Sequence, residues 1–87
     1  MTCRVEVHPA ALRELHKLPR PAFGEALKVI VALVTDPRPA GAKALVGEPS
    51  GTLRVRIGDY RIVYLVDDAQ RLVTIYRVAH RREVYER

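Results

Sequence analysis

The stretch "LRVRIGDYRIVYLVDDAQRLVTIYRV", residues 53–78, decides the fold of this chain. Apolar and polar residues alternate through it in three segments, 53–57, 60–66 and 71–78. A period of two indicates β-strands that turn one face toward a core. Gly58-Asp59 is a two-residue hairpin signal, and a second short polar turn lies at 67–70. Three strands joined by short turns predict an antiparallel meander, an arrangement that can leave one face to solvent.

A short strand and two helices are expected before the meander. "CRVEVH" (3–8) alternates like a strand, and Pro9 suits the first turn of a helix. The apolar residues of this first helix share one face at Leu12, Leu15 and Leu18. After a break at "PRP" (19–21), a second helical stripe is formed by Phe23, Leu27, Ile30 and Val34. Helices joined by so few residues predict an antiparallel helical hairpin.

The apolar faces of the hairpin and the meander can bury each other. The predicted fold is therefore α+β, a single small two-layer domain over residues 1–87 with two helices packed on an antiparallel sheet. The predicted order of elements is β-α-α-β-β-β. The Pro- and Gly-rich stretch 37–51 is expected to be irregular.

Charge points to an acidic partner. The net charge is +5 and the pI is about 9.9. The last 37 residues contain eight Arg and no Lys, and the planar guanidinium suits phosphate. A high genomic GC content also produces a bias toward Arg, so composition alone does not show that this segment binds phosphate.

Cysteine content and hydropathy argue against a disulfide-bonded, zinc-binding or membrane-spanning protein. Cys3 is the one cysteine, so no intramolecular disulfide is possible, and no Cys/His spacing resembles a zinc site. The longest apolar run, "VIVALV" (29–34), is too short to cross a bilayer, and the N-terminus has charges where a signal peptide is apolar. We expect a cytoplasmic protein without metal, cofactor or membrane partner.

Cationic and aromatic residues gather on the polar side of the meander and just beyond it. Strand alternation places Arg54 and Arg56 on one face, and the others are expected to converge along the same side. A basic surface with an aromatic ring suits single-stranded RNA. The alternative is a solvated face on a basic binding module, with a packing tyrosine and a surface histidine. The candidate residues are Arg54, Arg56, Arg61, Arg77, His80, Arg81, Arg82 and Tyr85.

Two motifs in these strands resemble a known family. "RIGDYRIVY" (56–64) and the closing "HRREVY" (80–85) are similar to the RelE/ParE superfamily of bacterial toxins, and to its RelE branch in particular. "HPAALRELHKLP" (8–19) and "DPRPAGAKALVG" (36–47) are also family-like. The resemblance therefore covers nearly the whole chain, and it implies two helices packed on a small antiparallel sheet.

The resemblance implies a type II toxin–antitoxin toxin, an endoribonuclease that cuts mRNA in the ribosomal A site. It implies a cognate antitoxin, the ribosome and mRNA as partners, with operator DNA bound only through the antitoxin complex. Carried over by position, Arg54 and Arg56 match basic catalytic and RNA-contacting residues. Arg61 matches the arginine at the start of a strand in the family, Arg81 matches the family's second phosphate-binding arginine, and Tyr85 matches its terminal tyrosine. His80 stands where relatives vary.

The implied chemistry needs proton transfer as well as positive charge. A 2′-hydroxyl attacks the adjacent phosphate, and arginines stabilise the charge that develops there. Arginine cannot act as a base because its pKa exceeds about 12. Proton transfer therefore falls to Tyr85, to His80, or to groups of the ribosome and mRNA. Tyr85 is alternatively a stacking platform.

The strand at 53–57 lacks the lysine that some family members carry there. Two further readings remain open at this point: a ParE-like gyrase inhibitor, and a non-catalytic RNA- or protein-binding relative.

Overall fold

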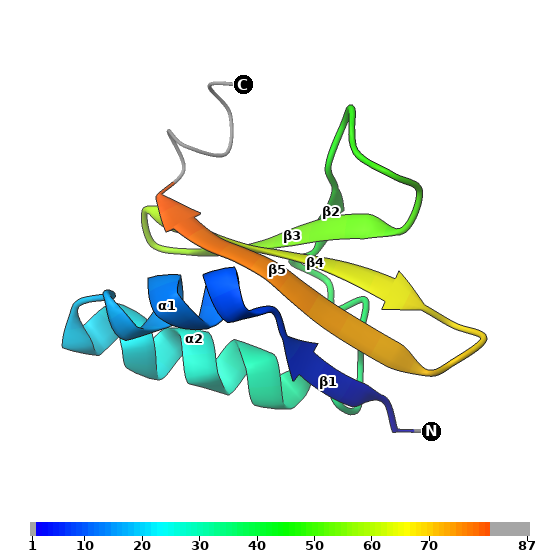
Figure 1. The fold of residues 1–87 in the computed structure, drawn as a ribbon, viewed down its shortest axis with the longest axis horizontal. Helices are drawn as coiled ribbons and strands as arrows, with labels where there is room; N and C mark the ends of the chain where they lie inside the picture. Colours follow the sequence, from blue (N-terminus) through cyan, green and yellow to red (C-terminus); the bar gives the residue numbers. More distant parts are fainter. Residues whose placement is uncertain (1, 81–87) are drawn as a thin grey trace.

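The computed structural model describes residues 2–80 as two helices packed against one five-stranded sheet (Figure 1). The predicted α+β, two-layer fold is confirmed. In chain order the elements are β1 (Arg4–Val7), α1 (Pro9–His16), α2 (Arg20–Ala32), β2 (Lys43–Ala44), β3 (Thr52–Ile57), β4 (Tyr60–Asp67) and β5 (Leu72–His80).

The sheet order is β1-β5-β4-β3-β2, and β3, β4 and β5 form the predicted antiparallel meander. The expectation of a wholly antiparallel sheet is wrong at one edge, because β1 pairs with β5 in parallel, from Arg4 opposite Leu72 to Val7 opposite Ile75. The helices and the meander separate these strands along the chain, and a connection of that length permits parallel pairing.

The predicted order of elements lacks one strand. β2 pairs antiparallel with β3, with Lys43 opposite Arg54 and Ala44 opposite Leu53. It lies in the Pro- and Gly-rich stretch that was expected to be irregular. Two residues are too few for alternation to be recognised in sequence.

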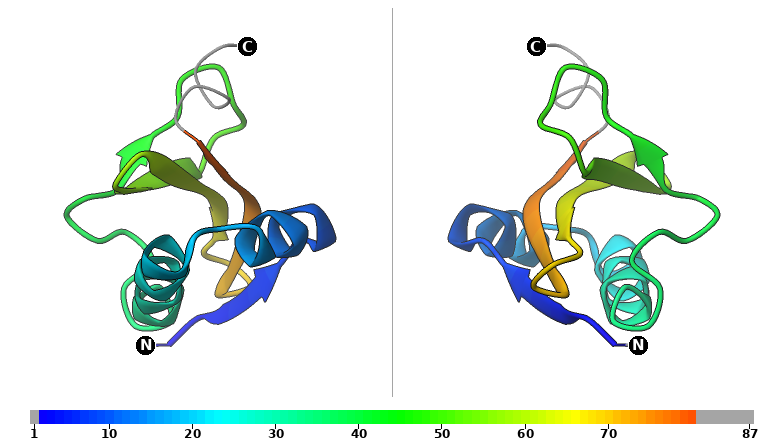
Figure 2. Two further views of the ribbon diagram at one scale, coloured as in Figure 1. Left: turned by 90° about the vertical axis from the view of Figure 1, so that its left-hand side faces the viewer. Right: turned by 90° about the vertical axis from the view of Figure 1, so that its right-hand side faces the viewer.

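Both helices lie on the same side of the sheet, and the loop between β2 and β3 rises on the other side (Figure 2). The β3–β4 hairpin has the predicted two-residue turn, since Ile57 pairs with Tyr60. Gly58 has φ of 60° there, a conformation that glycine adopts without a steric penalty.

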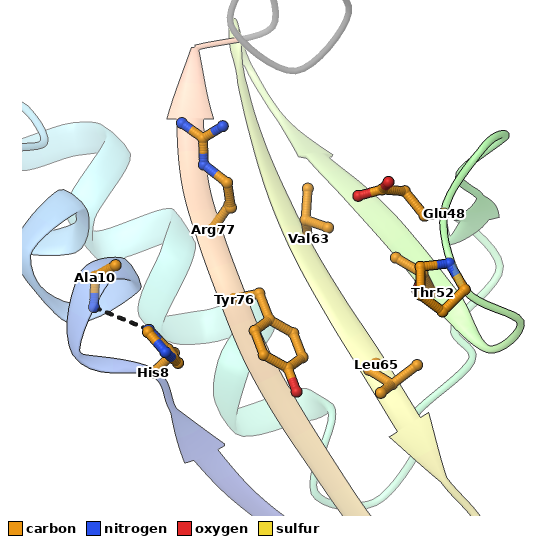
Figure 3. Close-up of a pocket in the computed structure, with 9 residues that line it drawn as sticks. His8, Ala10, Glu48, Thr52, Val63, Leu65, Tyr76 and Arg77 are labelled. Carbon is orange, nitrogen blue, oxygen red and sulfur yellow. Dashed lines mark hydrogen bonds between the residues drawn. The ribbon is translucent and has the colours of Figure 1, made fainter. Parts of the chain in front are cut away.

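A β-bulge interrupts the pairing of β4 with β5. Val63 pairs with Arg77, whereas the next residue, Tyr64, pairs with Ile75, so Tyr76 is the additional residue. Bulges bend a strand and redirect its side chains. Tyr76 and Arg77 consequently line the same pocket (Figure 3).

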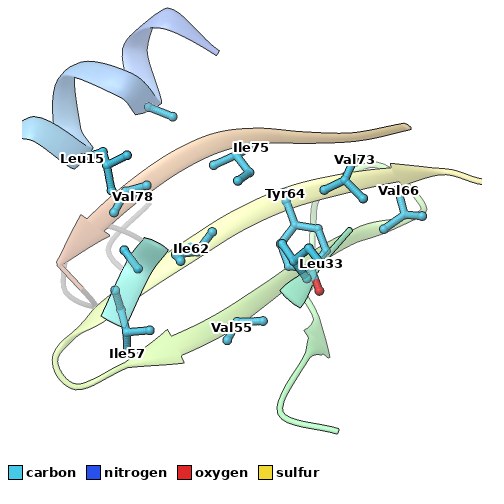
Figure 4. Packing of buried hydrophobic residues seen from close by; sticks show 12 residues of the cluster. Leu15, Leu33, Val55, Ile57, Ile62, Tyr64, Val66, Val73, Ile75 and Val78 are labelled. Atoms are coloured by element: carbon cyan, nitrogen blue, oxygen red, sulfur yellow. The ribbon is translucent and has the colours of Figure 1, made fainter. Parts of the chain in front are cut away.

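The core lies between the sheet and the helices (Figure 4). α1 and α2 contribute Ala11, Leu15 and Ala26, and Leu33 follows α2. The small alanines allow the helices to approach the sheet closely. The sheet contributes Val55, Ile57, Ile62, Tyr64, Val66, Val73, Ile75 and Val78.

The predicted helix stripes are partly wrong. Leu12 and Leu27, placed on the buried faces, are 44% and 41% exposed. Leu33, which lies outside the predicted stripe, is fully buried. Leucine spacing alone could not show that alanine occupies the centre of each helix–sheet contact.

One buried tyrosine ties the loop after α2 to the sheet. The Tyr64 hydroxyl donates to the Pro37 carbonyl at 2.9 Å, and burial raises the pKa of Tyr64 to about 12. Nearby, Arg38 makes a two-pronged ion pair with Asp68, with N–O distances of 2.9 and 2.8 Å. This contact lowers the pKa of the Asp68 carboxyl.

Candidate functional site: the arginine face

The sheet surface opposite the helices carries the predicted arginines, and we call it the arginine face. Cross-strand pairing arranges its residues in rows, and successive rows lie about 7 Å apart because same-face residues alternate. The row nearest the β3–β4 turn is Arg56, Arg61 and Ala79; the second is Lys43, Arg54, Val63 and Arg77; the third is Thr52, Leu65 and Thr74.

The β3–β4 hairpin fixes two guanidinium groups in the first row. Arg61 Nη1 donates to the Tyr60 carbonyl at 3.2 Å, and Arg56 Nε donates to the Gly58 carbonyl at 3.2 Å. Arg61 is buried, with 5% exposure, whereas Arg56 is exposed. The two residues are direct cross-strand partners. Because carbonyls of the turn orient them, their positive charge is positioned before any anion binds.

Helix α1 holds the end of β5 through one carboxylate. Glu14 Oε2 accepts from Arg77 Nη2 at 3.0 Å, and Glu14 Oε1 accepts from the backbone N–H of Val78 at 2.8 Å. β1 ends opposite Ile75, so within residues 2–80 this carboxylate replaces a neighbouring strand at Val78. Arg77 is thereby oriented at the border between α1 and the arginine face.

The structure brings together four of the predicted residues and separates a fifth from them. Arg54, Arg56, Arg61 and Arg77 share the arginine face, as predicted. His80 does not join them: it pairs with Tyr60 and contacts that ring edge-on, with centroids 5.7 Å apart, on the helix side of the sheet. β5 extends to His80, and alternation from Arg77 turns this imidazole to the opposite face. Arg81, Arg82 and Tyr85 lie outside the described residues.

Lys43 is a cation of the arginine face that sequence reasoning missed. It lies directly across from Arg54 and is exposed. The lysine that is absent from β3 is therefore present on the neighbouring strand. The signal was hidden because β2 has only two residues.

The arginine face is not uniformly open to solvent, contrary to the simplest reading of the meander. Leu45 packs over Val63 and Ala79, which are both buried. Leu45, in the loop between β2 and β3, thus covers this part of β4 and β5.

Two classes of site find no support in residues 2–80. No three His, Cys, Asp or Glu side chains in this part of the chain gather to hold a metal ion. Within the same residues, neither helix is long and apolar enough to cross a membrane.

Comparison with known proteins gives sequence matches to toxins of toxin–antitoxin systems. A family model described as the ParE toxin of type II toxin–antitoxin system, parDE, matches residues 5–85. Toxin RelG of Mycobacterium tuberculosis is 36% identical over an alignment of 88 positions that covers 100% of both chains.

Solved structures match in fold as well. In the toxin–antitoxin complex RelBE2 from Mycobacterium tuberculosis, the matching chain has a TM-score of 0.78 and 33% identity, with coverage of 92% of this chain and 99% of that one. The archaeal RelE–RelB complex from Pyrococcus horikoshii matches with a TM-score of 0.81 and 29% identity, covering 93% and 97%. The chain belongs to the RelE/ParE superfamily, the toxins of type II toxin–antitoxin systems.

Proposed function

We propose that this toxin is a ribosome-dependent endoribonuclease that cleaves mRNA in the A site and thereby inhibits translation. The observation that carries the proposal is the pair Arg56 and Arg61, which the hairpin carbonyls hold side by side in one row. Arg54 and Lys43 follow in the next row, where they suit a neighbouring phosphate of an extended strand.

The proposed reaction is attack by the RNA on itself. The 2′-oxygen loses its proton and bonds to phosphorus, the bond to the 5′-oxygen breaks, and that oxygen leaves with a proton. A 2′,3′-cyclic phosphate remains on one fragment. Arg61 and Arg56 stabilise the negative charge on the phosphorane, a role in which fixed donors are worth about 10²- to 10³-fold in rate. Arg81 and Arg82 are proposed as further phosphate contacts.

Proton transfer is assigned to groups other than the arginines. Tyr85 is proposed as the base or as the platform that orients the nucleotide. His80 is the weaker choice, since its ring packs against Tyr60 on the helix side. The ribosome supplies the remaining groups and orients the RNA. A site without its own strong base depends on such positioning for its rate.

The proposed partners follow from the same assignment. The relatives from Mycobacterium tuberculosis and Pyrococcus horikoshii were solved as toxin–antitoxin complexes. By analogy, a cognate antitoxin covers the arginine face of this protein, and operator DNA is bound only through that complex. Action on ribosomes places the protein in the cytoplasm.

Primer extension on an mRNA in a purified translation system tests the proposal. The wild type should cut within A-site codons, and the double variant Arg61→Ala, Arg81→Ala should not. Arg13→Ala is the matched control, because Arg13 is an exposed arginine on α1. Folded wild type that makes no cuts would overturn the proposal. Inhibition of gyrase supercoiling by that same protein would then support the ParE-like activity.

A further inference from the structure

A pocket of about 390 Å³ opens on the arginine face beside the cation rows (Figure 3). Its floor is β4 and β5, its far wall is the β2–β3 loop, and its near wall is the start of α1. Its volume lies within the range of small-molecule sites. Its lining combines the apolar side chains Val63, Leu65 and Tyr76 with the polar side chains His8, Glu48 and Thr52.

The aromatic wall of the pocket is held in position before anything binds. The bulge in β5 directs Tyr76 into the pocket, and its ring is 42% exposed. The His8 ring lies against it, with centroids 5.8 Å apart and planes inclined by 34°. His8 is itself fixed, because its Nδ1 accepts from the Ala10 N–H at 3.1 Å at the start of α1. Tyr76 is thus a partly exposed ring with restricted motion.

The pocket is continuous with the cation rows. Thr52, Val63 and Leu65 belong to the arginine face, and Val63 lies between Arg54 and Arg77 in the second row. An exposed ring next to arginines that follow a strand direction is the combination that single-stranded nucleic acid uses, with bases stacked and phosphates neutralised. The antitoxin proposed to cover this face is the alternative occupant, and the nucleotide probes used below contain none of its peptide groups.

From this arrangement we infer that the pocket binds one unstacked nucleobase of the RNA strand whose phosphates lie on the cation rows. The inference rests on the proposed function and extends it to a base-binding subsite built from Tyr76, His8, Glu48 and Thr52. The base stacks on Tyr76. Glu48 directs its carboxylate over the sheet (Figure 3), where it accepts from the amino or imino groups of a base edge. Guanine offers two such donors side by side, so the pocket favours guanine and disfavours uracil.

Nuclear magnetic resonance of the ¹⁵N-labelled full-length protein tests this subsite without requiring cleavage. The probes are GMP, UMP and ribose 5-phosphate. GMP should shift the amides of Thr52, Leu65 and Tyr76 in a saturable manner. Ribose 5-phosphate should bind at least about tenfold more weakly, since stacking of one base is worth roughly that factor. Tyr76→Ala should weaken GMP binding about tenfold, and Tyr76→Phe should preserve it.

Two controls separate the pocket from the rest of the surface. Leu27→Ala changes an exposed leucine of α2 and should leave every affinity unchanged. Glu48→Gln should reduce the preference for GMP over UMP. Equal shifts with GMP and ribose 5-phosphate, or none at the pocket amides, would overturn the inference.

The two proposals fail separately. If the protein cuts mRNA but binds GMP and ribose 5-phosphate equally well, only the inference about the base-binding pocket is overturned. If GMP shifts these amides but the protein makes no cuts in mRNA, only the proposed endoribonuclease activity is overturned.

Discussion

The two faces of the sheet use the same strands but hold their side chains in different ways. On the core face, residues such as Ile62 and Ile75 are held by apolar neighbours and by the helices above them. On the arginine face, Arg56 and Arg61 are oriented by carbonyls of the hairpin turn, and Arg77 by one carboxylate from α1. The difference indicates that the helices bury the side chains of the core face, while hydrogen bonds position charge on the arginine face. Substitutions should therefore separate stability from activity according to the face they touch.

The largest expected effect is on the core face, at Ile62. This side chain has no exposed surface and lies between Arg61 and Val63 on β4. Ile62→Ala removes buried methyl groups and leaves a cavity, so we expect about 2–5 kcal/mol less free energy of unfolding. Urea denaturation followed by circular dichroism measures the loss. Ile62→Val should cost about 0.5–1.5 kcal/mol. Equal stability of the Ala variant and the wild type would contradict the division between the faces.

The next residue, Arg61, should show the opposite behaviour. Under the proposed function, Arg61→Ala is expected to lower A-site cleavage about 10²- to 10³-fold, because the oriented charge proposed to face the reacting phosphate is lost. Its free energy of unfolding should change much less than that of Ile62→Ala. Arg61→Lys is the matched control, since it keeps the charge and loses the planar fork. Single-turnover cleavage on ribosomes, together with urea denaturation of each variant, provides both readouts. Parallel losses of stability and rate would show that Arg61 is a structural residue.

Glu14 connects the two faces and should give a smaller, mixed effect. Glu14→Ala leaves the Val78 N–H without its acceptor and Arg77 without this carboxylate, at a cost of about 1–3 kcal/mol. Glu14→Gln retains an acceptor for the amide and loses the ion pair. Amide hydrogen exchange at Val78 should therefore be faster in the Ala variant than in the Gln variant. Equal protection of Val78 in both variants would show that the carboxylate does not hold the end of β5.

The same comparison explains what sequence could predict. Alternation with a period of two assigned Arg54 and Arg56 to one face. Arg61 was expected beside them through the pairing of the meander, because antiparallel hairpins with short turns have a fixed register. The face of His80 could also have been predicted from alternation. It was missed because the predicted strand ended at residue 78, whereas β5 extends to His80. Counting onward from Arg77 would have turned it to the helix side.

Other features depend on contacts that no local pattern contains. The bulge at Tyr76 arises from pairing between β4 and β5, and the pocket arises from this bulge, the start of α1 and the β2–β3 loop together. The position of β1 at the edge of the sheet is likewise a long-range pairing. Lys43 joins the cation rows only through its pairing with Arg54. The meander, the two helices and the arginines of β3 and β4 could thus be predicted from local patterns, whereas the sheet edges, the bulge, the pocket and Lys43 depend on tertiary contacts.

The smallest expected effect concerns Tyr64, the core-face residue that anchors the loop before β2. Tyr64→Phe removes the hydrogen bond to Pro37 and should cost about 0.5–1.5 kcal/mol at neutral pH. The pKa of Tyr64 is raised to about 12 in the folded protein, above a value near 10 in the unfolded chain. The folded state therefore keeps the proton more tightly, so this contribution is complete below about pH 10 and declines as the pH rises toward 12.

The alkaline behaviour separates Tyr64 from the arginine face. Urea denaturation at pH 8, 10 and 11 should show that the wild type loses its advantage over Tyr64→Phe as the pH rises, because the Tyr64 hydroxyl ionises in the unfolded chain at a lower pH than in the folded protein. Tyr76→Phe is the matched control, since that ring is partly exposed and lies on the other face. Its stability at pH 8 should be close to that of the wild type. A constant difference between Tyr64→Phe and the wild type would mean that the folded protein does not retain the Tyr64 proton, and that the anchor at Pro37 is weaker than its 2.9 Å distance implies.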